Sequence, residues 1–394
     1  MRIGIVGAGI FGLSAALELV RRKHAVTVFD QGEPPFERAA SCDYSKVLRF
    51  EYGPVCPLYV PLVEESRTRY RALEARAGKP LYVETGVLAL ARAFDPSRHE
   101  WLSHNYLVEH DYPVEVWTPA EARRRYPQFS YAGIEAVTWN AAGGYVRASD
   151  AVRATAASAR EAGATLVVGA RVLGVQEEAG AALVSFAAAA GGGAGAPANR
   201  LVGSVGDALR FDAVLMAAGA WFGRLVPTLA QHVAPACQFV TYYRPRDRAA
   251  FAPPAFPVWM HDLVDSGWYG VPAGEEGLVK VARHQPAEPA DPDAPRVVFE
   301  EDRAASRAFV AEHLPALGAD TYAEDRGCLY AMTGDGHFLI DRLPGCARLY
   351  VAGGGSGHGF KLGPAVGRLA ADLVERGERV HAFTFDAERS GSVT

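Results

Sequence analysis

The glycines near the N-terminus have a spacing that suits the binding of a dinucleotide. Gly7, Gly9 and Gly12 form a GxGxxG turn inside the segment GIVGAGIFGL. The first glycine of such a turn permits a tight bend, the second lets the backbone approach a pyrophosphate, and the third lets the following helix pack closely. Asp30 follows at the distance where a carboxylate accepts hydrogen bonds from a ribose. An ordinary glycine-rich turn would not need this acid, but the motif does not choose between NAD and FAD.

A second group of residues suited to chemistry lies near the other end of the chain. The segment GCLYAMTGDGHFLID carries the thiol of Cys328, and a glycine-rich turn, GGGSGHG, precedes Lys361. The glycines of that turn let the backbone approach a planar ring closely. A helix expected to begin near Gly363 and Pro364 directs the positive end of its dipole at the same place. One site built from both ends of the chain indicates flavin chemistry.

The elements that must position these residues can be predicted from the hydrophobic pattern. An apolar run from Ile3 to Val6 predicts a buried parallel strand, and residues 13–22 predict a helix that points its N-terminal amides at the phosphates. Residues 26–29 predict the second strand. A later buried strand over 213–217, followed by a turn at Gly219, is expected to pack beside this unit.

The rest of the chain alternates between helix and strand patterns. Thr118 with Glu121 predicts a capping box, and Ser149 predicts the N-cap of another helix. Helices are expected at 58–76, 118–126, 149–162 and 301–314, strands within 81–90 and 163–178, a low-complexity hairpin tip at 187–199 and a proline-rich loop at 284–296. No internal repeat is evident.

Bulk properties indicate a soluble enzyme. A chain of 394 residues exceeds the usual size of one hydrophobic core, which predicts two domains. The formal net charge of −5 argues against nucleic acid or an anionic membrane as partner. The apolar N-terminal segment fits the glycine turn better than a secretion signal, because only Arg2 precedes it as a basic residue. Five cysteines without metal-type spacing predict a reducing cytoplasm and no metal site.

The chain resembles the monomeric sarcosine oxidase and N-methyltryptophan oxidase family, within the D-amino-acid-oxidase-like group of FAD enzymes. The similarity runs nearly end to end through GAGIFG, SCDYSKVLRFEYG, AAGAWFGRL, WYGVPAGEEGLVKVARH, GCLYAMTGDGHFLID and GGSGHGFKLGP. The resemblance implies an α/β (α+β) fold with a discontinuous Rossmann-like FAD domain and a smaller substrate domain whose mainly antiparallel sheet roofs the flavin. We expect the FAD domain at 1–80, 145–230 and 322–394, and the substrate domain at 81–144 and 231–321.

The resemblance implies FAD held by a thioether from Cys328, although an ordinary buried cysteine is the alternative. A thioether fixes the flavin ring and tunes its electronics. Cys42 stands where the sarcosine oxidases have a histidine, and we expect no second flavin bond there. The predicted cofactor-binding residues are Gly7, Gly9, Ile10, Phe11, Gly12, Asp30, Ser41, Cys42, Val172, Gly219, Trp221, Cys328, Gly355, Gly357, His358, Gly359 and Lys361.

The catalytic residues expected from the resemblance include two lysines. Lys280 matches the family lysine that assists reaction with oxygen, where a cation stabilises developing negative charge; a surface lysine is the alternative. Lys46 replaces a second arginine of the sarcosine oxidases and is similar to the fructosyl-amino-acid oxidases, which puts sarcosine itself in doubt. Tyr269 and His284 fall where the family has substrate-side residues.

Arg49 and Lys361 match the family pair that holds a substrate carboxylate, and Tyr330 is expected beside them. Arginine offers a planar fork for bidentate binding, and lysine adds a mobile point charge. The alternatives are a solvated strand charge for Arg49 and a helix-start residue for Lys361. A lysine at a helix start is poorly placed against the dipole unless an anion lies nearby.

Together these residues predict an FAD-dependent oxidase. It would convert the C–N bond of a secondary amine carboxylate to an imine and reduce O2 to H2O2, as a monomer or weak homo-oligomer with no nucleic acid or membrane partner. A fructosyl-amino-acid oxidase, a flavin amine dehydrogenase with another electron acceptor, an NAD-dependent dehydrogenase and a non-catalytic flavin protein remain alternatives.

Overall fold

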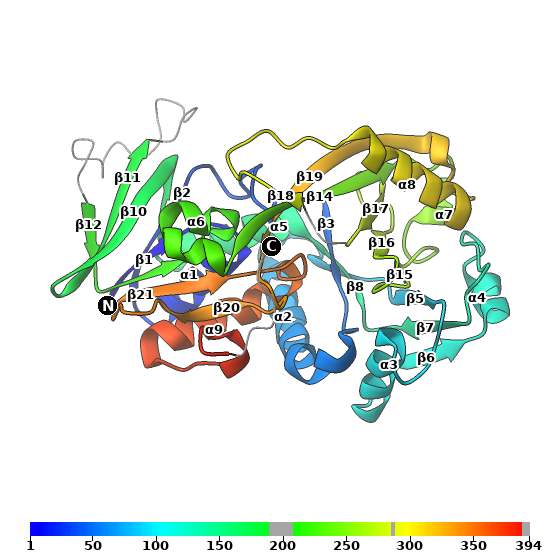
Figure 1. Ribbon diagram of the computed structural model, residues 1–394, viewed down its shortest axis with the longest axis horizontal. Coiled ribbons are helices and arrows are strands. Elements are labelled where there is room, and N and C mark those ends of the chain that lie inside the picture. Colours follow the sequence, from blue (N-terminus) through cyan, green and yellow to red (C-terminus); the bar gives the residue numbers. More distant parts are fainter. Residues whose placement is uncertain (189–207, 285–287, 388–394) are drawn as a thin grey trace.

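The structure is a computed structural model that describes residues 1–188, 208–284 and 288–387. An α/β region lies at one end of the molecule and a β-rich region at the other (Figure 1). The strands β14 (Ala234–Tyr243) and β19 (Tyr322–Met332) pair with each other and run along one side between the two regions. Most of the hairpin tip predicted at 187–199 falls outside the described residues.

The α/β region is built on a mainly parallel sheet. Its strands, in spatial order, are β20 (Leu339–Arg342), β21 (Leu349–Gly353), β13 (Ala213–Met216), β1 (Arg2–Val6), β2 (Ala25–Asp30) and β9 (Thr165–Val168). Each neighbouring pair is parallel except β20 with β21. Parallel strands are covered on both faces, which explains their continuous apolar runs. The strands predicted at 3–6, 26–29 and 213–217 are confirmed.

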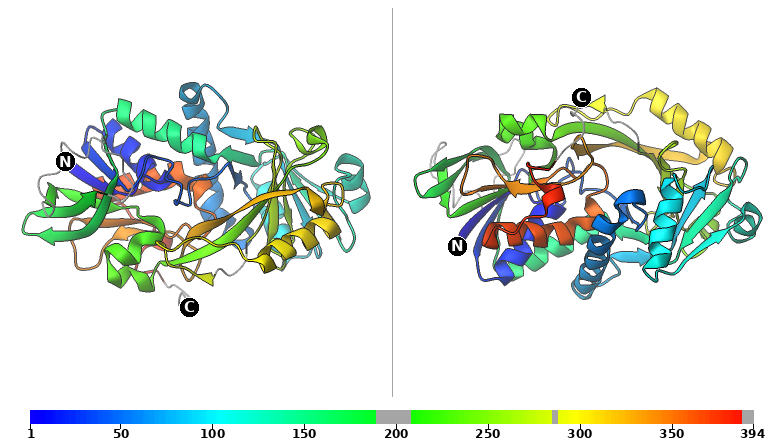
Figure 2. Two further views of the ribbon diagram at one scale, coloured as in Figure 1. Left: turned by 90° about the horizontal axis from the view of Figure 1, so that it is seen from above. Right: turned by 60° about the horizontal axis from the view of Figure 1, so that its bottom comes forward.

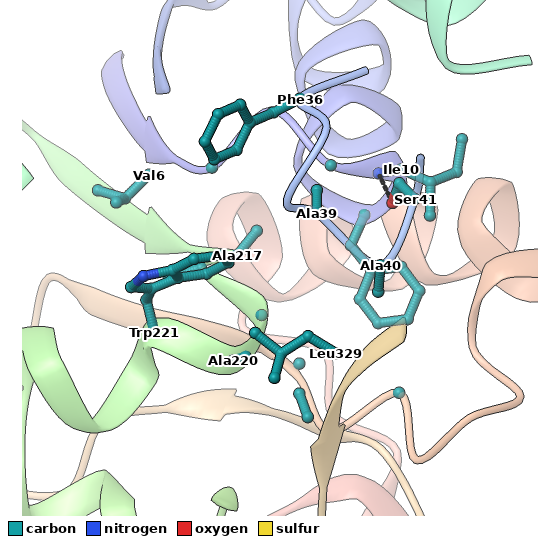
Figure 3. Close-up of a pocket in the computed structure, with 18 of the residues that line it drawn as sticks. Val6, Ile10, Phe36, Ala39, Ala40, Ser41, Ala217, Ala220, Trp221 and Leu329 are labelled. Carbon is teal, nitrogen blue, oxygen red and sulfur yellow. Dashed lines mark hydrogen bonds between the residues drawn. The ribbon is translucent and has the colours of Figure 1, made fainter. Parts of the chain in front are cut away.

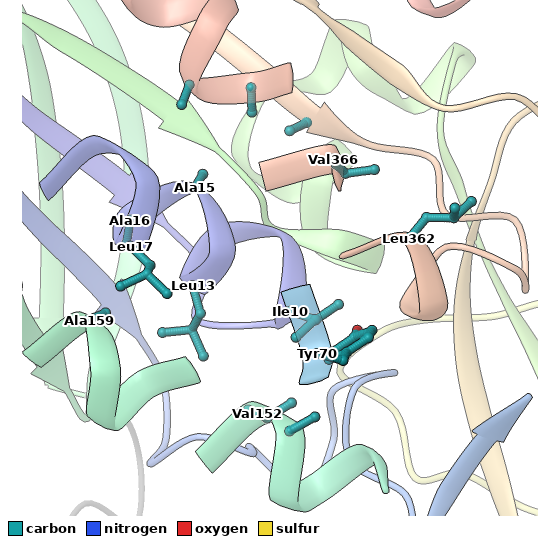
Figure 4. Close-up of a cluster of buried hydrophobic side chains, with 14 of the residues drawn as sticks. Ile10, Leu13, Ala15, Ala16, Leu17, Tyr70, Val152, Ala159, Leu362 and Val366 are labelled. Carbon is teal, nitrogen blue, oxygen red and sulfur yellow. The ribbon is translucent and has the colours of Figure 1, made fainter. Parts of the chain in front are cut away.

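Helices cover one face of this sheet. They are α1 (Ile10–Arg21) and α9 (Gly363–Arg376), with α5 (Ala148–Glu161) packed on α1, and α2 (Cys56–Ala77) packed on α5 and α9. Leu13 and Leu17 of α1 pack toward α5, and Val366 of α9 belongs to the same buried cluster (Figure 4). Gly367 lets α9 approach α1, because a Cβ at this position would overlap Ser14. Elements from both ends of the chain therefore pack together, as both views of Figure 2 show.

The opposite face of the parallel sheet is covered by an antiparallel sheet of β10 (Ala170–Glu178), β11 (Ala181–Ala188) and β12 (Ala208–Phe211). Phe29 of β2 contacts Phe186 of β11 and Phe211 of β12, with ring centroids 5.1 and 5.9 Å apart. These aromatic contacts seal the second face and leave the carboxyl ends of β1 and β2 open.

The β-rich region contains a mainly antiparallel sheet, as expected, and we call it the roofing sheet. Its strand order is β18 (Glu288–Pro289), β14, β17 (Val279–Arg283), β16 (Trp268–Val271), β15 (Val258–His261), β5 (Val87–Ala91), β7 (Ala136–Asn140) and β6 (Val114–Trp117). β15 and β5 form the parallel pair. Helix α8 (Glu300–His313) covers this sheet because Phe309 stacks on Trp259 and Trp268.

A small sheet joins the two regions. It consists of β3 (Ser45–Leu48), β8 (Gly144–Arg147) and β4 (Tyr82–Glu84). The N-cap predicted at Ser149 is wrong: α5 begins at Ala148 with Arg147 as N-cap. Ser149 instead donates from its backbone N–H and its hydroxyl to the carbonyl oxygen of Asp43. This tertiary contact ties α5 to the segment before β3.

The remaining helices lie in connections: α3 (His99–Glu109), α4 (Pro119–Arg125), α6 (Phe222–Leu225) and α7 (Arg248–Phe251). The capping box of Thr118 and Glu121 at the start of α4 is confirmed. Within the described ranges, none of the helices has the length and apolar character needed to cross a membrane. All five cysteines are free thiols.

Candidate active site

A cavity of about 330 Å³ lies at the carboxyl ends of β1 and β2 and extends to β19 and the loop after β21. Its volume falls in the usual range for cofactor and small-molecule sites. Figure 3 shows Ile10 and the segment carrying Phe36 and Ser41 on one side, with Trp221 and Leu329 on the other. The predicted residues that line it are Gly7, Gly9, Ile10, Phe11, Asp30, Ser41, Lys46, Val172, Gly219, Trp221, Cys328, Tyr330, Gly355, Gly357 and Gly359.

The glycine turn lines one end of the cavity. Gly7 has a φ of +106°, and a Cβ there would overlap the carbonyl oxygen of Ala217. Gly12 does not line the cavity; it lets α1 pack against the turn, because a Cβ would overlap the carbonyl oxygen of Gly7. The N-terminus of α1 therefore faces the cavity, with the Ile10 N–H held by Ser41 Oγ at 3.1 Å (Figure 3). A helix N-terminus in this position suits a pyrophosphate.

Asp30 lies where a ribose would be bound. Its Oδ2 accepts from Ala8 N–H at 2.6 Å and its Oδ1 from Gly32 N–H at 3.2 Å. Burial raises the pKa of this carboxyl, and these backbone hydrogen bonds oppose the rise. A carboxylate has about four acceptor positions, so lone pairs remain for sugar hydroxyl groups. This end of the cavity fits the adenosine diphosphate portion of a dinucleotide.

The other end of the cavity contains a thiol and a cation, and the backbone of a glycine turn passes close to aromatic rings there. Cys328 and Lys46 both line the cavity, and Lys46 Nζ lies 3.5 Å from Cys328 Sγ. Gly357 has a φ of +77°, and a Cβ there would lie 2.6 Å from the Tyr330 ring and 3.0 Å from His284. The backbone can thus pass close to these rings. A planar group that reaches Cys328 would lie between the glycine turn and β19.

The two lysines predicted to be catalytic, Lys280 and Lys46, share one carboxylate. Lys280 is 2% exposed and does not line the cavity; its Nζ donates to Asp43 Oδ2 at 2.7 Å and to the Ser45 carbonyl at 2.9 Å. Lys46 Nζ lies 2.8 Å from the same Oδ2. Sequence reasoning missed Asp43. The three-residue spacing from Lys46 was the available signal, but nothing in the sequence placed Lys280 beside it.

The side chains of Arg49 and Lys361 both lie over the ring of Tyr52. Arg49 Cζ lies 4.8 Å and Lys361 Nζ 5.0 Å from the ring centroid. Arg49 Nη1 is buried without a hydrogen-bond partner among the described residues, and Lys361 donates to the His358 carbonyl at 3.2 Å. Burial, reinforced by the charge of Arg49, lowers the pKa of Lys361 well below its usual value. Two desolvated cations with unused donors form a site that favours an anion.

The titratable rings around this pair are uncharged near neutral pH. Burial, then the charges of Arg49 and Lys361, lowers the pKa of His284 to about 4. Burial also lowers the pKa of His358 far enough to keep it neutral, so its Nε2–H donates to the Gly336 carbonyl at 2.9 Å. Burial raises the pKa of Tyr269 to about 12 and that of Tyr330 well above its usual value. These rings therefore add no charge beside the two cations, and the buried carboxylate of Glu51 opposes the lowering of the Lys361 pKa without cancelling it.

Some residues predicted to bind the cofactor lie outside the cavity lining. They are Gly12, Cys42, His358 and Lys361. Sequence reasoning also missed several residues that line it: Gln31, Phe36, Arg171, Leu173, Arg224, Leu225, Ala331, Ser356 and Phe360. Gln31, Phe36 and Ser356 lie in connections, whereas the others lie on separate elements such as β10, α6 and β19, and only the fold brings them together. Among the described residues, no group of three or more His, Cys, Asp and Glu side chains could hold a metal ion.

Comparisons with known proteins bear on the family and the fold of this chain. The family described as "FAD dependent oxidoreductase" (DAO) matches residues 2–373. An N-methyl-L-tryptophan oxidase from Yersinia pestis (strain Pestoides F) is 27% identical over 375 residues, covering 93% of each chain.

Two solved structures share the fold. L-proline dehydrogenase from P. horikoshii has a TM-score of 0.78 at 21% identity, covering 96% of this chain and 94% of that one. The deglycating fructosamine oxidase (Amadoriase II) from Aspergillus fumigatus has a TM-score of 0.76 at 24% identity, covering 97% and 87%. These likenesses support the predicted combination of a Rossmann-like FAD domain and a roofing sheet.

Proposed function

The chain belongs to the DAO family of FAD-dependent oxidoreductases, and from this premise we propose that it oxidises the C–N bond of a secondary amine bearing a carboxylate. The observation that carries the proposal is the pair of cationic side chains, Arg49 and Lys361, that both lie within about 5 Å of the centroid of the Tyr52 ring. A carboxylate would fill the unused donor at Arg49 Nη1 and offset the cost of burying both charges. The curated relative acts, by its name, on an N-methylated amino acid.

The cavity residues support the placement of FAD. The glycine turn and Asp30 would hold the dinucleotide end, and the turn at Gly355–Gly359 would leave room for the flavin ring. Bound FAD supplies the chemistry of accepting two electrons as a hydride equivalent. A thioether to Cys328 belongs to the proposal, supported by its position in the cavity wall beside Lys46.

The residues of the site act by positioning and by charge. Arg49 and Lys361 orient the carboxylate, and this fixes the α-carbon relative to the flavin. The same cations disfavour an ammonium, so the substrate binds with a neutral amine whose lone pair can assist oxidation. His284, Tyr269 and Tyr330 are uncharged and close the pocket without serving as a strong base. The imine product is hydrolysed by water after release.

Oxygen is the electron acceptor that the two lysines favour. Lys46 lines the cavity, and Lys280 lies behind it on the shared carboxylate. A cation at this position stabilises negative charge that develops on oxygen. The neighbours in structure include a protein named as a dehydrogenase and others named as oxidases, so the fold alone does not choose the acceptor.

An anaerobic substrate screen tests the proposal. Purified protein is mixed with N-alkyl, cyclic and fructosyl amino acids, each paired with the same amine lacking its carboxylate, while the flavin absorbance is followed. We expect bleaching by at least one carboxylate compound and not by its matched amine, then recovery of colour and H2O2 formation when O2 is admitted. A colourless protein, or equal bleaching by matched amines, contradicts the proposal. Recovery that requires an artificial acceptor identifies a dehydrogenase.

The fructosyl arm of this screen has a specific motive. Lys46 replaces the arginine of the sarcosine oxidases, and a fructosamine oxidase is among the structural neighbours. Bleaching confined to fructosyl amino acids would assign this chain to that substrate class.

The proposal also includes a compartment and an oligomeric state. The five free thiols support a reducing cytoplasm, and we propose a monomer or weak homo-oligomer.

A further inference from the structure

Asp43 is a buried carboxylate that contacts residues from both regions of the molecule. Its Oδ2 accepts from Lys46 of β3 at 2.8 Å and from Lys280 of β17 at 2.7 Å. Its Oδ1 accepts from the Tyr242 hydroxyl of β14 and lies 3.6 Å from Arg326 Nη1 of β19. The side chain of Asp43 is 1% exposed. Strands of the small joining sheet and of the roofing sheet thus converge on one acid.

The position of Asp43 is fixed by its backbone as well as by its side chain. The Ser149 N–H and hydroxyl both donate to the Asp43 carbonyl, at 3.0 and 2.8 Å. Lys280 donates to the Ser45 carbonyl in addition to Asp43 Oδ2. The backbone of Asp43 is therefore held by α5, and its carboxylate cannot move without breaking contacts to Lys280 and Tyr242 of the roofing sheet.

The charges around Asp43 do not balance. Lys46, Lys280 and Arg326 face a single carboxylate. The other titratable groups of the described residues around the cluster are Tyr44, Tyr242, Tyr269, Tyr330, Cys42 and Cys328. Two ammonium groups on one oxygen repel each other, and burial further favours the neutral form of a lysine. Without the carboxylate, one of the two lysines would lose its proton first.

The pKa directions identify which lysine is less protected. Burial would lower the pKa of Lys46, but Asp43 outweighs this effect and raises it. Burial lowers the pKa of Lys280, Asp43 opposes that shift and the charge of Lys46 adds to it. Lys280 is the more deeply buried member of the pair, with 2% of its side chain exposed against 16% for Lys46.

We propose that Asp43 is a positioning residue that keeps Lys46 in the cavity wall and Lys280 behind it charged together, so that Lys280 remains cationic while O2 is reduced. Reduction of O2 to H2O2 takes two electrons from reduced FAD and two protons from it and from solvent. The lysine charges stabilise the negative charge that appears during this transfer. This inference rests on the proposed FAD chemistry, but not on the identity of the amine.

The Asp43→Asn variant tests the inference, because asparagine keeps the shape and removes the charge. Flavin-loaded protein is reduced with dithionite, so that no amine is needed, and mixed with O2 over a pH series. The parent rate should be flat across neutral pH. In Asp43→Asn the rate should be highest at low pH and fall by up to about tenfold per pH unit above the lowered pKa of Lys280. The absorption spectrum of the oxidised flavin should titrate at the same pH.

Two further variants identify the titrating group. Asp43→Asn combined with Lys280→Met should abolish the new step in the rate and in the spectrum, whereas Asp43→Glu should restore the parent profile in part. Asp341→Asn is the matched control: Asp341 is also buried, accepts from Arg379 and lies outside the cavity. Asp341→Asn should lower the free energy of unfolding without adding a pH-dependent step to the reoxidation rate or to the flavin spectrum.

A flat profile in Asp43→Asn, or a step that survives in the double variant, overturns the inference. If Asp43→Asn does not fold, Lys46→Gln decides the question, because Lys280 then has the carboxylate to itself. The fall in rate at high pH should move to higher pH in Lys46→Gln; no movement, or movement to lower pH, overturns the inference. If no amine carboxylate bleaches the flavin but the pH profiles of reoxidation are as expected, the substrate proposal is refuted and the role of Asp43 is not.

Discussion

Individual side chains explain why the candidate site should bind an acid. Arg49 and Lys361 are like charges that the chain buries on one tyrosine ring, and the ring face stabilises each cation by an attraction of about 0.5–2 kcal/mol. That attraction does not replace the lost hydration. The arrangement is therefore stabilised most when an anion lies between the two donors.

Arg49→Ala should weaken the binding of carboxylate inhibitors by about 2–5 kcal/mol, because it leaves the anion and Lys361 imperfectly paired. Binding is measured by the change in flavin absorbance on titration. Arg67→Ala is the control, since Arg67 also lies over an aromatic ring, Phe50, but already pairs with Glu64. Equal affinity in the parent and Arg49→Ala would place the substrate carboxylate elsewhere.

Inhibitor binding should also depend on pH through Lys361. Its pKa is lowered in the free protein, and a bound carboxylate favours the charged lysine. Affinity should therefore be highest below the free-protein pKa of Lys361 and fall as pH rises through it. The measurement is the dissociation constant of a carboxylate inhibitor at a series of pH values. Lys361→Met should bind weakly at every pH and lose this dependence; a dependence that persists would belong to another group.

Cys328→Ser should release the flavin. The parent protein should remain yellow after acid precipitation, whereas the variant should leave its flavin in the supernatant, as judged by absorbance. Cys237→Ser is the matched control, because Cys237 lies on the adjacent strand β14 and does not line the cavity. Flavin lost equally from the parent and from Cys328→Ser would show that no thioether forms.

At the scale of elements, the approach of α1 to β1 decides whether the phosphate site exists. Gly12 is the contact point, because any Cβ would overlap the Gly7 carbonyl. Gly12→Ala should lower both the flavin content and the thermal midpoint. Thr118→Ala removes a helix cap far from the cavity and should cost about 1 kcal/mol of stability without changing flavin content. Full flavin loading in Gly12→Ala would contradict this role.

Elements with a strong local signal were predicted well. The helices predicted at 58–76 and 301–314 correspond to α2 and α8 within a few residues, and the capping box marked the start of α4. Ser149 misled the prediction because its hydroxyl has a tertiary partner, the Asp43 carbonyl, which no local pattern reveals. The short strand β3 was also missed, since four residues carry too little periodicity.

At the scale of the whole molecule, a buried hydrogen bond links the roofing sheet to the segment that carries Arg49. Asn140 at the end of β7 donates to Glu51 at 2.8 Å, and Glu51 follows Arg49 by two residues. Asn140→Ala should lower the free energy of unfolding by about 1–3 kcal/mol, because it leaves a buried carboxylate without this donor. Urea unfolding measures the effect. Arg98→Ala, which breaks an exposed ion pair with Asp265, should lower the free energy of unfolding by much less than Asn140→Ala does. Equal effects would contradict a structural role for Asn140.

The division into an FAD domain at 1–80, 145–230 and 322–394 and a substrate domain at 81–144 and 231–321 stays a proposal. Two sets of strands pair across it. β4 joins β3 and β8, and β19 of the proposed FAD domain pairs along β14 of the proposed substrate domain. These ladders couple the two regions mechanically.

The sequence alone determined the dinucleotide unit, because glycine spacing and apolar periodicity act over a few residues and require no distant partner. Its resemblance to a known family predicted that a thiol, lysines and an arginine would serve the site, and these roles stay predictions. Only the tertiary structure decided that Lys280 and Lys46 share Asp43, and that Arg49 and Lys361 both lie over the ring of Tyr52. Such contacts join residues far apart in the chain, and they arise from the way the strands are ordered and buried, which local sequence patterns do not encode.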